Sequence, residues 1–188
     1  PEVRFTGATV WPIINRAEMM DISVKTIEID RRGKEGLICK DNIRADIKVT
    51  FFVRVNKSAD GVLHVAQAIG CAHASNPRII ADLFSAKFSE ALKTVGKNMN
   101  FEDLYTKRQI FKDEILKVIG TDLNGFTLDD CAIDYLEQTP IESLDKDNIM
   151  DAEGIKKITD LTVIQNVKTN ELRQKERMEI GSQNLARS

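Results

Sequence analysis

The chain has 188 residues, of which 42% are hydrophobic and 30% are charged, a composition typical of a soluble globular protein. Its 27 basic and 29 acidic residues give a net charge of −2, which argues against a nucleic-acid partner. No stretch approaches the roughly 20 apolar residues of a membrane-spanning helix and no signal peptide is visible, so the chain is not expected to cross a bilayer by itself.

The first 14 residues are predicted to form β structure with an apolar end. Residues 3–14 read V-R-F-T-G-A-T-V-W-P-I-I, two short β-prone pieces that break at Gly7 and stop at Pro12. The apolar side chains near Trp11 could pack in the core or along a sheet edge. They could also contact a membrane, because Trp favours bilayer interfaces. The candidates for membrane contact are Val10, Trp11 and Ile13.

Residues 20–55 are predicted to form an antiparallel meander. Strand character in residues 20–30 changes phase near Thr26, which predicts a bulge or burial on both sides. Residues 37–39 form a short strand, and the turns around it are too short for a parallel crossover. Residues 44–55, R-A-D-I-K-V-T-F-F-V-R-V, are the central strand, because apolar and polar side chains alternate. The side chains predicted to face the core are Ala45, Ile47, Val49, Phe51, Val53 and Val55.

Three amphipathic helices are predicted to follow and to cover one face of this sheet. The first spans residues 58–70, between a Ser cap and a final Gly. The second spans residues 76–96 and carries Pro at its first position. The third spans residues 100–120 and begins with an Asn and Asp spaced as a capping box. The predicted apolar faces consist of Val62, Val65, Ala66 and Ile69, then Ile80, Leu83, Phe84, Phe88, Leu92 and Val95, then Leu104, Phe111, Ile115, Val118 and Ile119.

Residues 126–137 return to strand character, with a phase slip at Asp129-Asp130. A strand that follows a run of helices is expected to rejoin the existing sheet. The fold class predicted for residues 1–138 is therefore α+β, an antiparallel meander covered by three amphipathic helices, with a late strand that rejoins the sheet.

Residues 139–148 are predicted to be a linker, and residues 149–188 a helical extension. Opposite charges four residues apart favour a helix. Several β-branched residues leave a strand at residues 161–167 as an alternative. The apolar residues of this segment step by three and wind around the helix instead of forming one stripe.

The sequence contains no set of residues that predicts catalysis. His64 and His73 are the only histidines, and the motifs of serine hydrolases, P-loops and dinucleotide-binding folds are absent. Cys71 and His73 could supply two metal ligands, but a zinc site needs three or four. The three cysteines are isolated, so we expect free thiols in a reducing compartment. We predict no enzyme, metal or cofactor, with an enzyme using Cys71 and His73 as an alternative.

Four sequence features form one pattern in chain order. They are V-W-P-I at residues 10–13, F-F-V-R-V at residues 51–55, the helix that begins at Asn76-Pro77, and N-I-M-D-A-E-G-I at residues 148–155. Together they resemble the SPFH (stomatin, prohibitin, flotillin; band 7) superfamily over residues 1–157, and bacterial flotillin-like inner-membrane proteins in particular.

The resemblance implies a non-enzymatic scaffold at a bacterial inner membrane, associated with the membrane or on its cytoplasmic side. An anchor would lie outside this chain, the domain would lie beside lipid headgroups and membrane-proximal proteins, and a coiled coil would drive homo-oligomers. The implied oligomer contacts are Ile155, Ile158, Leu161 and Ile164. A competing hypothesis is a soluble module that binds a partner along an exposed sheet edge.

Overall fold

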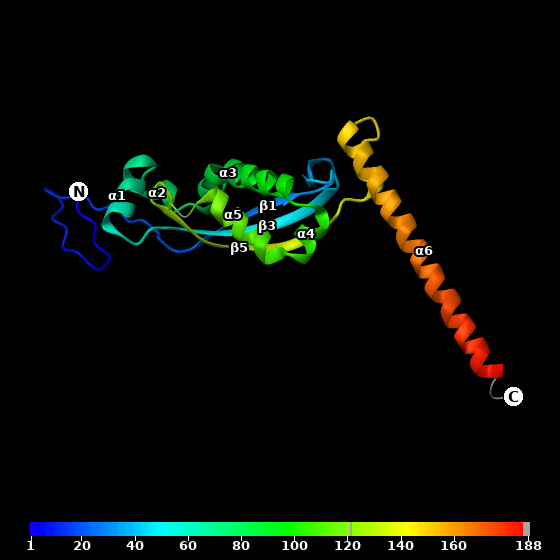
Figure 1. Cartoon of the computed structure of the whole chain (residues 1–188). Helices are drawn as coiled ribbons and strands as arrows, with labels where there is room; N and C mark the ends of the chain where they lie inside the picture. The colour runs from blue at the N-terminus through cyan, green and yellow to red at the C-terminus, as the bar shows by residue number, and fades with distance from the viewer. Residues whose placement is uncertain (121, 186–188) are drawn as a thin grey trace.

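The computed structural model describes residues 1–120 and 122–185, in which a five-stranded antiparallel sheet packs against a layer of helices (Figure 1). The strand order is β1-β3-β5-β4, and β2 pairs with β3. The α+β class predicted from the sequence is confirmed. The strands are β1 (Lys25–Arg31), β2 (Leu37–Ile38), β3 (Arg44–Val55), β4 (Asp122–Leu123) and β5 (Phe126–Gln138).

Strand β3 is the centre of the sheet, as its alternating sequence predicts. All six side chains predicted to face the core are buried, with at most 1% exposure. β5 pairs with one edge of β3 from Ala45 to Val55. β1 and β2 therefore lie one after the other along the opposite edge, at 47–53 and 44–45. The turn between them, which contains the 3-10 helix η1 (Gly33–Glu35), separates two segments that share one partner strand.

The late strand β5 rejoins the sheet beside β3, which confirms that prediction. The pairing shifts register where Asp130 lies opposite Phe52 and Leu128 lies opposite Val53. Asp129 is thus the extra residue of a β-bulge, and this bulge is the physical cause of the phase slip in the sequence.

The helices α1 (Ala59–Ala68) and α3 (Pro77–Asn98) begin where their caps predict. The Ser58 hydroxyl accepts a hydrogen bond from the backbone N–H of Gly61 at 3.0 Å. The Asn76 side chain accepts one from the backbone N–H of Arg78 at 3.0 Å. A short helix, α2 (Cys71–Ala74), lies between α1 and α3 and was not predicted.

The third predicted helix is two helices, α4 (Phe101–Thr106) and α5 (Arg108–Ile119), which meet at a non-helical Lys107. The predicted capping box at its start was wrong. The cap comes from outside the helix, because the Asp41 carboxylate accepts the hydrogen bond of the Phe101 N–H at 3.2 Å. A cap contributed by a distant turn leaves no local sequence signal.

The predicted β structure near the N-terminus was also wrong. Residues 1–24, all of which the structure describes, contain no strand. In this segment the Trp11 carbonyl accepts from the N–H groups of Ile14 and Asn15, and the Asp21 N–H donates to the hydroxyl of the distant Ser75 at 2.8 Å. β1 begins only at Lys25, so the phase change that the sequence shows near Thr26 marks the approach to the strand and is not a bulge.

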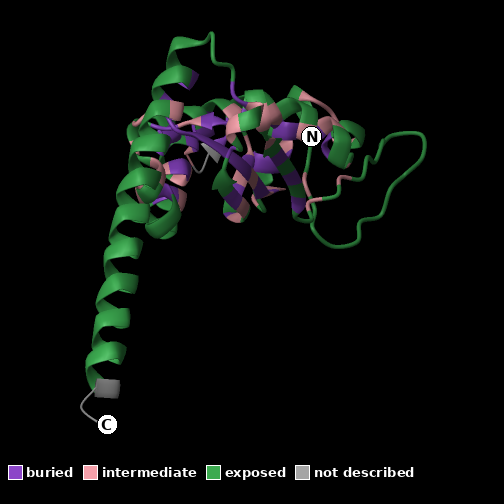
Figure 2. Cartoon of the chain, turned by 90° about the vertical axis from the view of Figure 1, so that its right-hand side faces the viewer, coloured by how far each residue is buried: buried purple, intermediate pink, exposed green. Residues whose placement is uncertain are grey.

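The C-terminal extension is one helix, α6 (Ile149–Leu185). It continues through residues 161–167, which excludes the alternative strand at that position. α6 leaves the end of the sheet opposite to the N-terminal segment, and most of its length is exposed (Figures 1 and 2).

The aromatic centre of the core provides a test of the helix faces. We expect Phe88→Ala to lower the free energy of unfolding by about 3–5 kcal/mol, because the Phe88 ring is fully buried and a cavity would remain. Its centroid lies 4.5 Å from that of Phe51.

Leu83 is the matched control for Phe88, because it lies on the same helix. The sequence predicted that Leu83 lies in the core, yet its side chain is 49% exposed at the flank of the buried stripe. Val118 on α5 was also predicted to lie in the core and is 46% exposed. Leu83→Ala should cost about 1 kcal/mol or less in urea unfolding. Equal costs for the two variants would contradict the observed helix face.

Candidate functional site

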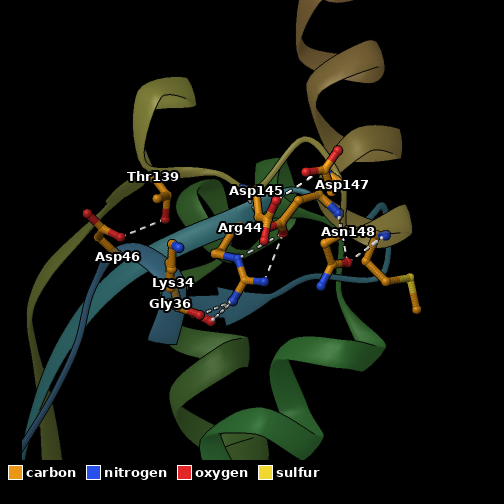
Figure 3. Close-up of polar contacts among 10 residues, drawn as sticks. Lys34, Gly36, Arg44, Asp46, Thr139, Asp145, Asp147 and Asn148 are labelled. Carbon is orange, nitrogen blue, oxygen red and sulfur yellow. Dashed lines mark hydrogen bonds and ion pairs between the residues drawn. The ribbon is translucent and has the colours of Figure 1, made fainter.

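The D-A-E-G sequence at residues 151–154 forms the first turns of α6 and meets the start of β3. α6 begins here because the Asn148 side chain accepts a hydrogen bond from the backbone N–H of Met150 at 3.0 Å. Asp151 then accepts hydrogen bonds from Arg44, the first residue of β3. This contact joins two residues that are 107 positions apart. Figure 3 shows Arg44 beside Asp145, in the loop that leads into α6.

Arg44 and Asp151 form a buried ion pair in which all three guanidinium nitrogens and both carboxylate oxygens have a hydrogen-bond partner. The Arg44 Nη2 and Nε atoms donate to Asp151 Oδ1 at 2.8 and 3.1 Å. The Arg44 Nη1 atom donates to the carbonyl oxygens of Lys34 and Gly36 at 2.6 and 3.3 Å. The other Asp151 oxygen accepts from the backbone N–H of Asp145 at 3.1 Å. These bonds offset the cost of removing both charges from water.

The other residues of D-A-E-G fit the turn before β3. The Asn42 amide donates to the Glu153 carboxylate at 2.6 Å. Gly154 lies against the Asn42 carbonyl oxygen, and a Cβ at this position would overlap that atom. Asn42 has a φ of 62°, a conformation that Asn tolerates better than most residues. The motif thus shapes the surface by which α6 docks on the domain.

A second polar contact ties the end of β5 to the same region. The Thr139 hydroxyl donates to Asp46 Oδ1 at 2.6 Å, and the Gly33 N–H donates to the same oxygen at 2.9 Å. The alternation of β3 predicts that Arg44 and Asp46 point outward, but both are buried. Residues 139–151 return over this end of the sheet, which the strand pattern could not reveal.

The residues predicted to contact a membrane lie together in a turn at the opposite end of the domain, near α1 and α2 (Figure 1). Trp11 is 67% exposed and Ile13 is 98% exposed, and Val10 is also exposed. Within the part of the chain that the structure describes, no helix combines the length and apolar character needed to span a membrane.

The residues predicted to form oligomer contacts divide into two pairs. Ile155 is half-buried and Ile158 is buried, close to the junction. Leu161 and Ile164 are exposed, with no part of the domain covering them. Other apolar side chains of α6 are also exposed but were not predicted as oligomer contacts; they are Ile149, Met150, Val163, Val167, Leu172, Met178 and Ile180.

The three free thiols all lie in surroundings that favour the protonated form. Burial raises the pKa of the Cys39 thiol to about 12 and that of Cys131 to about 11. The pKa of Cys71 is raised by burial and by the nearby Glu18 carboxylate. Across residues 1–120 and 122–185, no group of three or more His, Cys, Asp or Glu residues could hold a metal ion, including around Cys71 and His73.

Comparison with known proteins gives one matching family model and two relatives described below. Residues 6–176 match the family model described as SPFH domain / Band 7 family, a range that contains both halves of the junction. The flotillin family inner membrane protein YqiK of Escherichia coli K12 is 31% identical over 170 residues, which cover 89% of this chain and 31% of YqiK. The flotillin family inner membrane protein sll1021 of Synechocystis is 27% identical over 143 residues, which cover 74% and 21%. The chain thus spans less than a third of either relative.

The junction can be tested by removing one partner of the ion pair. We expect Asp151→Ala to lower the free energy of unfolding by about 3–5 kcal/mol, because it leaves the Arg44 charge buried without its counter-ion. Replacing both residues, with Arg44→Met and Asp151→Leu, should recover most of this loss.

Glu153→Ala serves as the control, because its bond to Asn42 is exposed and should contribute about 1 kcal/mol or less. Urea unfolding followed by circular dichroism measures all four proteins. An Asp151→Ala variant as stable as the Glu153→Ala variant would contradict the central role of the pair.

Proposed function

Because the chain belongs to the SPFH (Band 7) family, we propose that it is a non-enzymatic, flotillin-like scaffold domain that assembles with copies of itself at a membrane. The observation that carries this proposal is the long helix α6, which is held by the domain at one end and is exposed along the rest of its length. Such a helix is suited to join one domain to its neighbours.

The exposed part of α6 favours helix-to-helix contact. Residues 159–183 are all exposed, although apolar side chains recur among them. A single helix of 37 residues, about 55 Å long, obtains most of its stability from packing an apolar face. Val163, Ile164 and Val167 lie on one side of the helix, since residues three and four apart are neighbours. Leu161 is a neighbour of Ile164 in the same way. A second copy of α6 would cover these four apolar side chains.

The junction would give this assembly a defined geometry. The Arg44 guanidinium contacts Asp151 through two nitrogen atoms, which restricts the direction in which α6 leaves the sheet. Association of the helices would therefore place the attached domains in a fixed relation to each other.

The N-terminal turn supports a position at a lipid surface. YqiK and sll1021 are named inner membrane proteins, and we extend that location to this chain. Trp11, Ile13, Ile14 and Met19 are exposed apolar side chains of the N-terminal segment, which lies at the end of the domain away from α6 (Figure 1). Trp side chains favour the headgroup region of bilayers. The domain would lie between the lipid and the helices that assemble.

One observation favours the alternative of a module that binds a partner along a sheet edge. β1 lies at the end of the strand order, so its outer backbone groups face away from the sheet and are available to a further strand. This activity needs neither the apolar side chains of α6 nor a membrane, so the experiments below separate the two functions.

Self-assembly is tested on α6. We expect the mass of the chain in sedimentation experiments to rise with concentration from the micromolar to the millimolar range. The double variant Leu161→Glu with Ile164→Glu should stay monomeric, because burying two carboxylates in an apolar contact is unfavourable.

The variant Gln165→Glu with Asn166→Glu is the control for this test. It adds the same charge to the same turn of α6 without removing an apolar side chain. A parent chain that stays monomeric at every concentration would contradict the proposal and favour the sheet-edge function.

Lipid contact is tested on Trp11, which is the only tryptophan in the chain. With phosphatidylglycerol vesicles, we expect its fluorescence to shift to shorter wavelength as the ring leaves water. Trp11→Ala should weaken vesicle flotation tenfold or more, since a factor of ten requires the loss of only about 55 Å² of buried apolar area. Ile110→Ala, at an exposed position on α5, is the control. Equal flotation of all three proteins would overturn the lipid contact.

A further inference from the structure

We propose that a basic cavity beside the junction binds a small phosphorylated anion. The cavity has a volume of about 530 Å³ and lies between the turn that precedes β2 and the last turns of α3. This size suits a small ligand. Its basic lining residues are Arg31, Lys34, Arg44, Lys93 and Lys97.

The cavity carries an excess of positive charge. Five cationic residues line it, against the carboxylates of Glu35 and Glu90. Asp151 neutralises Arg44 from outside the cavity, so four cations face two carboxylates. A concave surface with a net positive charge attracts anions.

The arginine of the cavity wall is held in place before any ligand arrives. The Arg31 Nε atom donates to the carbonyl oxygen of Glu35 at 3.1 Å, and its Nη1 atom donates to the Ser89 hydroxyl at 2.7 Å. Both acceptors are neutral, so the Arg31 charge is retained. A fixed guanidinium loses little conformational entropy when it binds an anion.

The lysines of the cavity are free to contact a ligand. Lys34, Lys93 and Lys97 form no ion pair with any residue that the structure describes. Lys93 and Lys97 lie four residues apart on α3, where two like charges repel each other. An anion between them would turn this repulsion into two attractive contacts.

A phosphate group fits this arrangement better than a single carboxylate. Phosphate carries up to two charges and several acceptor oxygens, which match an arginine fork and several mobile ammonium groups. Its source could be a soluble phosphorylated metabolite or the headgroup of an anionic lipid. Arg44 lines the cavity and also pairs with Asp151, so the cavity lies at the end of the domain where α6 begins. The N-terminal segment lies at the opposite end (Figure 1).

The test is a titration of the complete chain with inorganic pyrophosphate, followed by changes in the backbone amide signals in NMR spectra. We expect the affected amides to cluster at residues 33–36 and 90–97. The double variant Lys93→Gln with Lys97→Gln should bind about tenfold or more weakly. Both positions are exposed, so the variant should fold as the parent does.

Lys87→Gln is the matched control, because Lys87 is an exposed lysine on the same helix but does not line this cavity. The proposal is overturned if pyrophosphate causes no clustered changes or if the double variant binds as tightly as Lys87→Gln. It is also overturned if only a glutamate-rich peptide occupies the cavity, since the ligand would then be a protein segment.

A second arm identifies the source of the phosphate. Phosphatidylglycerol vesicles that displace pyrophosphate from the parent chain would assign the cavity to a lipid headgroup. Vesicles that bind the chain through Trp11 and leave pyrophosphate in place would assign it to a soluble ligand. Pyrophosphate binding does not depend on self-assembly. Failure of the cavity proposal can therefore be distinguished from failure of the scaffold function.

Discussion

The buried pair of Arg44 and Asp151 is the interaction on which the arrangement of domain and helix depends. Removing both charges from water is costly, and four bonds from the guanidinium together with the Asp145 N–H offset that cost. An apolar pair could give similar stability. The ion pair adds direction, because a planar guanidinium bonds its partners only in a narrow range of orientations. α6 therefore leaves the sheet at a set angle.

Strand β3 connects this junction to the other end of the molecule. Its 12 residues run from Arg44, beside α6, to Val55, next to the loop that leads into α1. Because β3 is paired along both edges and buried on its core face, it is a rigid element. The N-terminal segment that contains Trp11 lies at one end of the domain, and α6 lies at the other (Figures 1 and 2). The lining of the basic cavity includes Arg44, which pairs with Asp151 of α6, so the cavity lies at the α6 end. The proposed scaffold function requires this separation.

Features that depend on neighbouring residues were predicted correctly from the sequence. The alternation in β3, the caps at Ser58 and Asn76, and the slip at Asp129-Asp130 all act over a few residues. The failures occurred where a distant group competes with the local pattern. Asp41 caps the helix that begins at Phe101, and in the 1–24 segment the Asp21 N–H bonds the distant Ser75 hydroxyl while the Trp11 carbonyl closes a turn. Neither outcome has a local signal.

The sequence by itself determined the fold class, the central strand and the resemblance to the SPFH family, since these follow from periodicity and ordered motifs. It favoured a helix after residue 148, but only the structure excluded a strand at residues 161–167. It also drew attention to D-A-E-G without revealing what the motif does. Only the tertiary structure decided that Asp151 pairs with Arg44, that Gly154 fits against the Asn42 carbonyl, and that lysines from η1 and α3 surround one cavity. These contacts join residues far apart in the chain, and burial and charge pairing at such separations leave no periodic trace in the sequence.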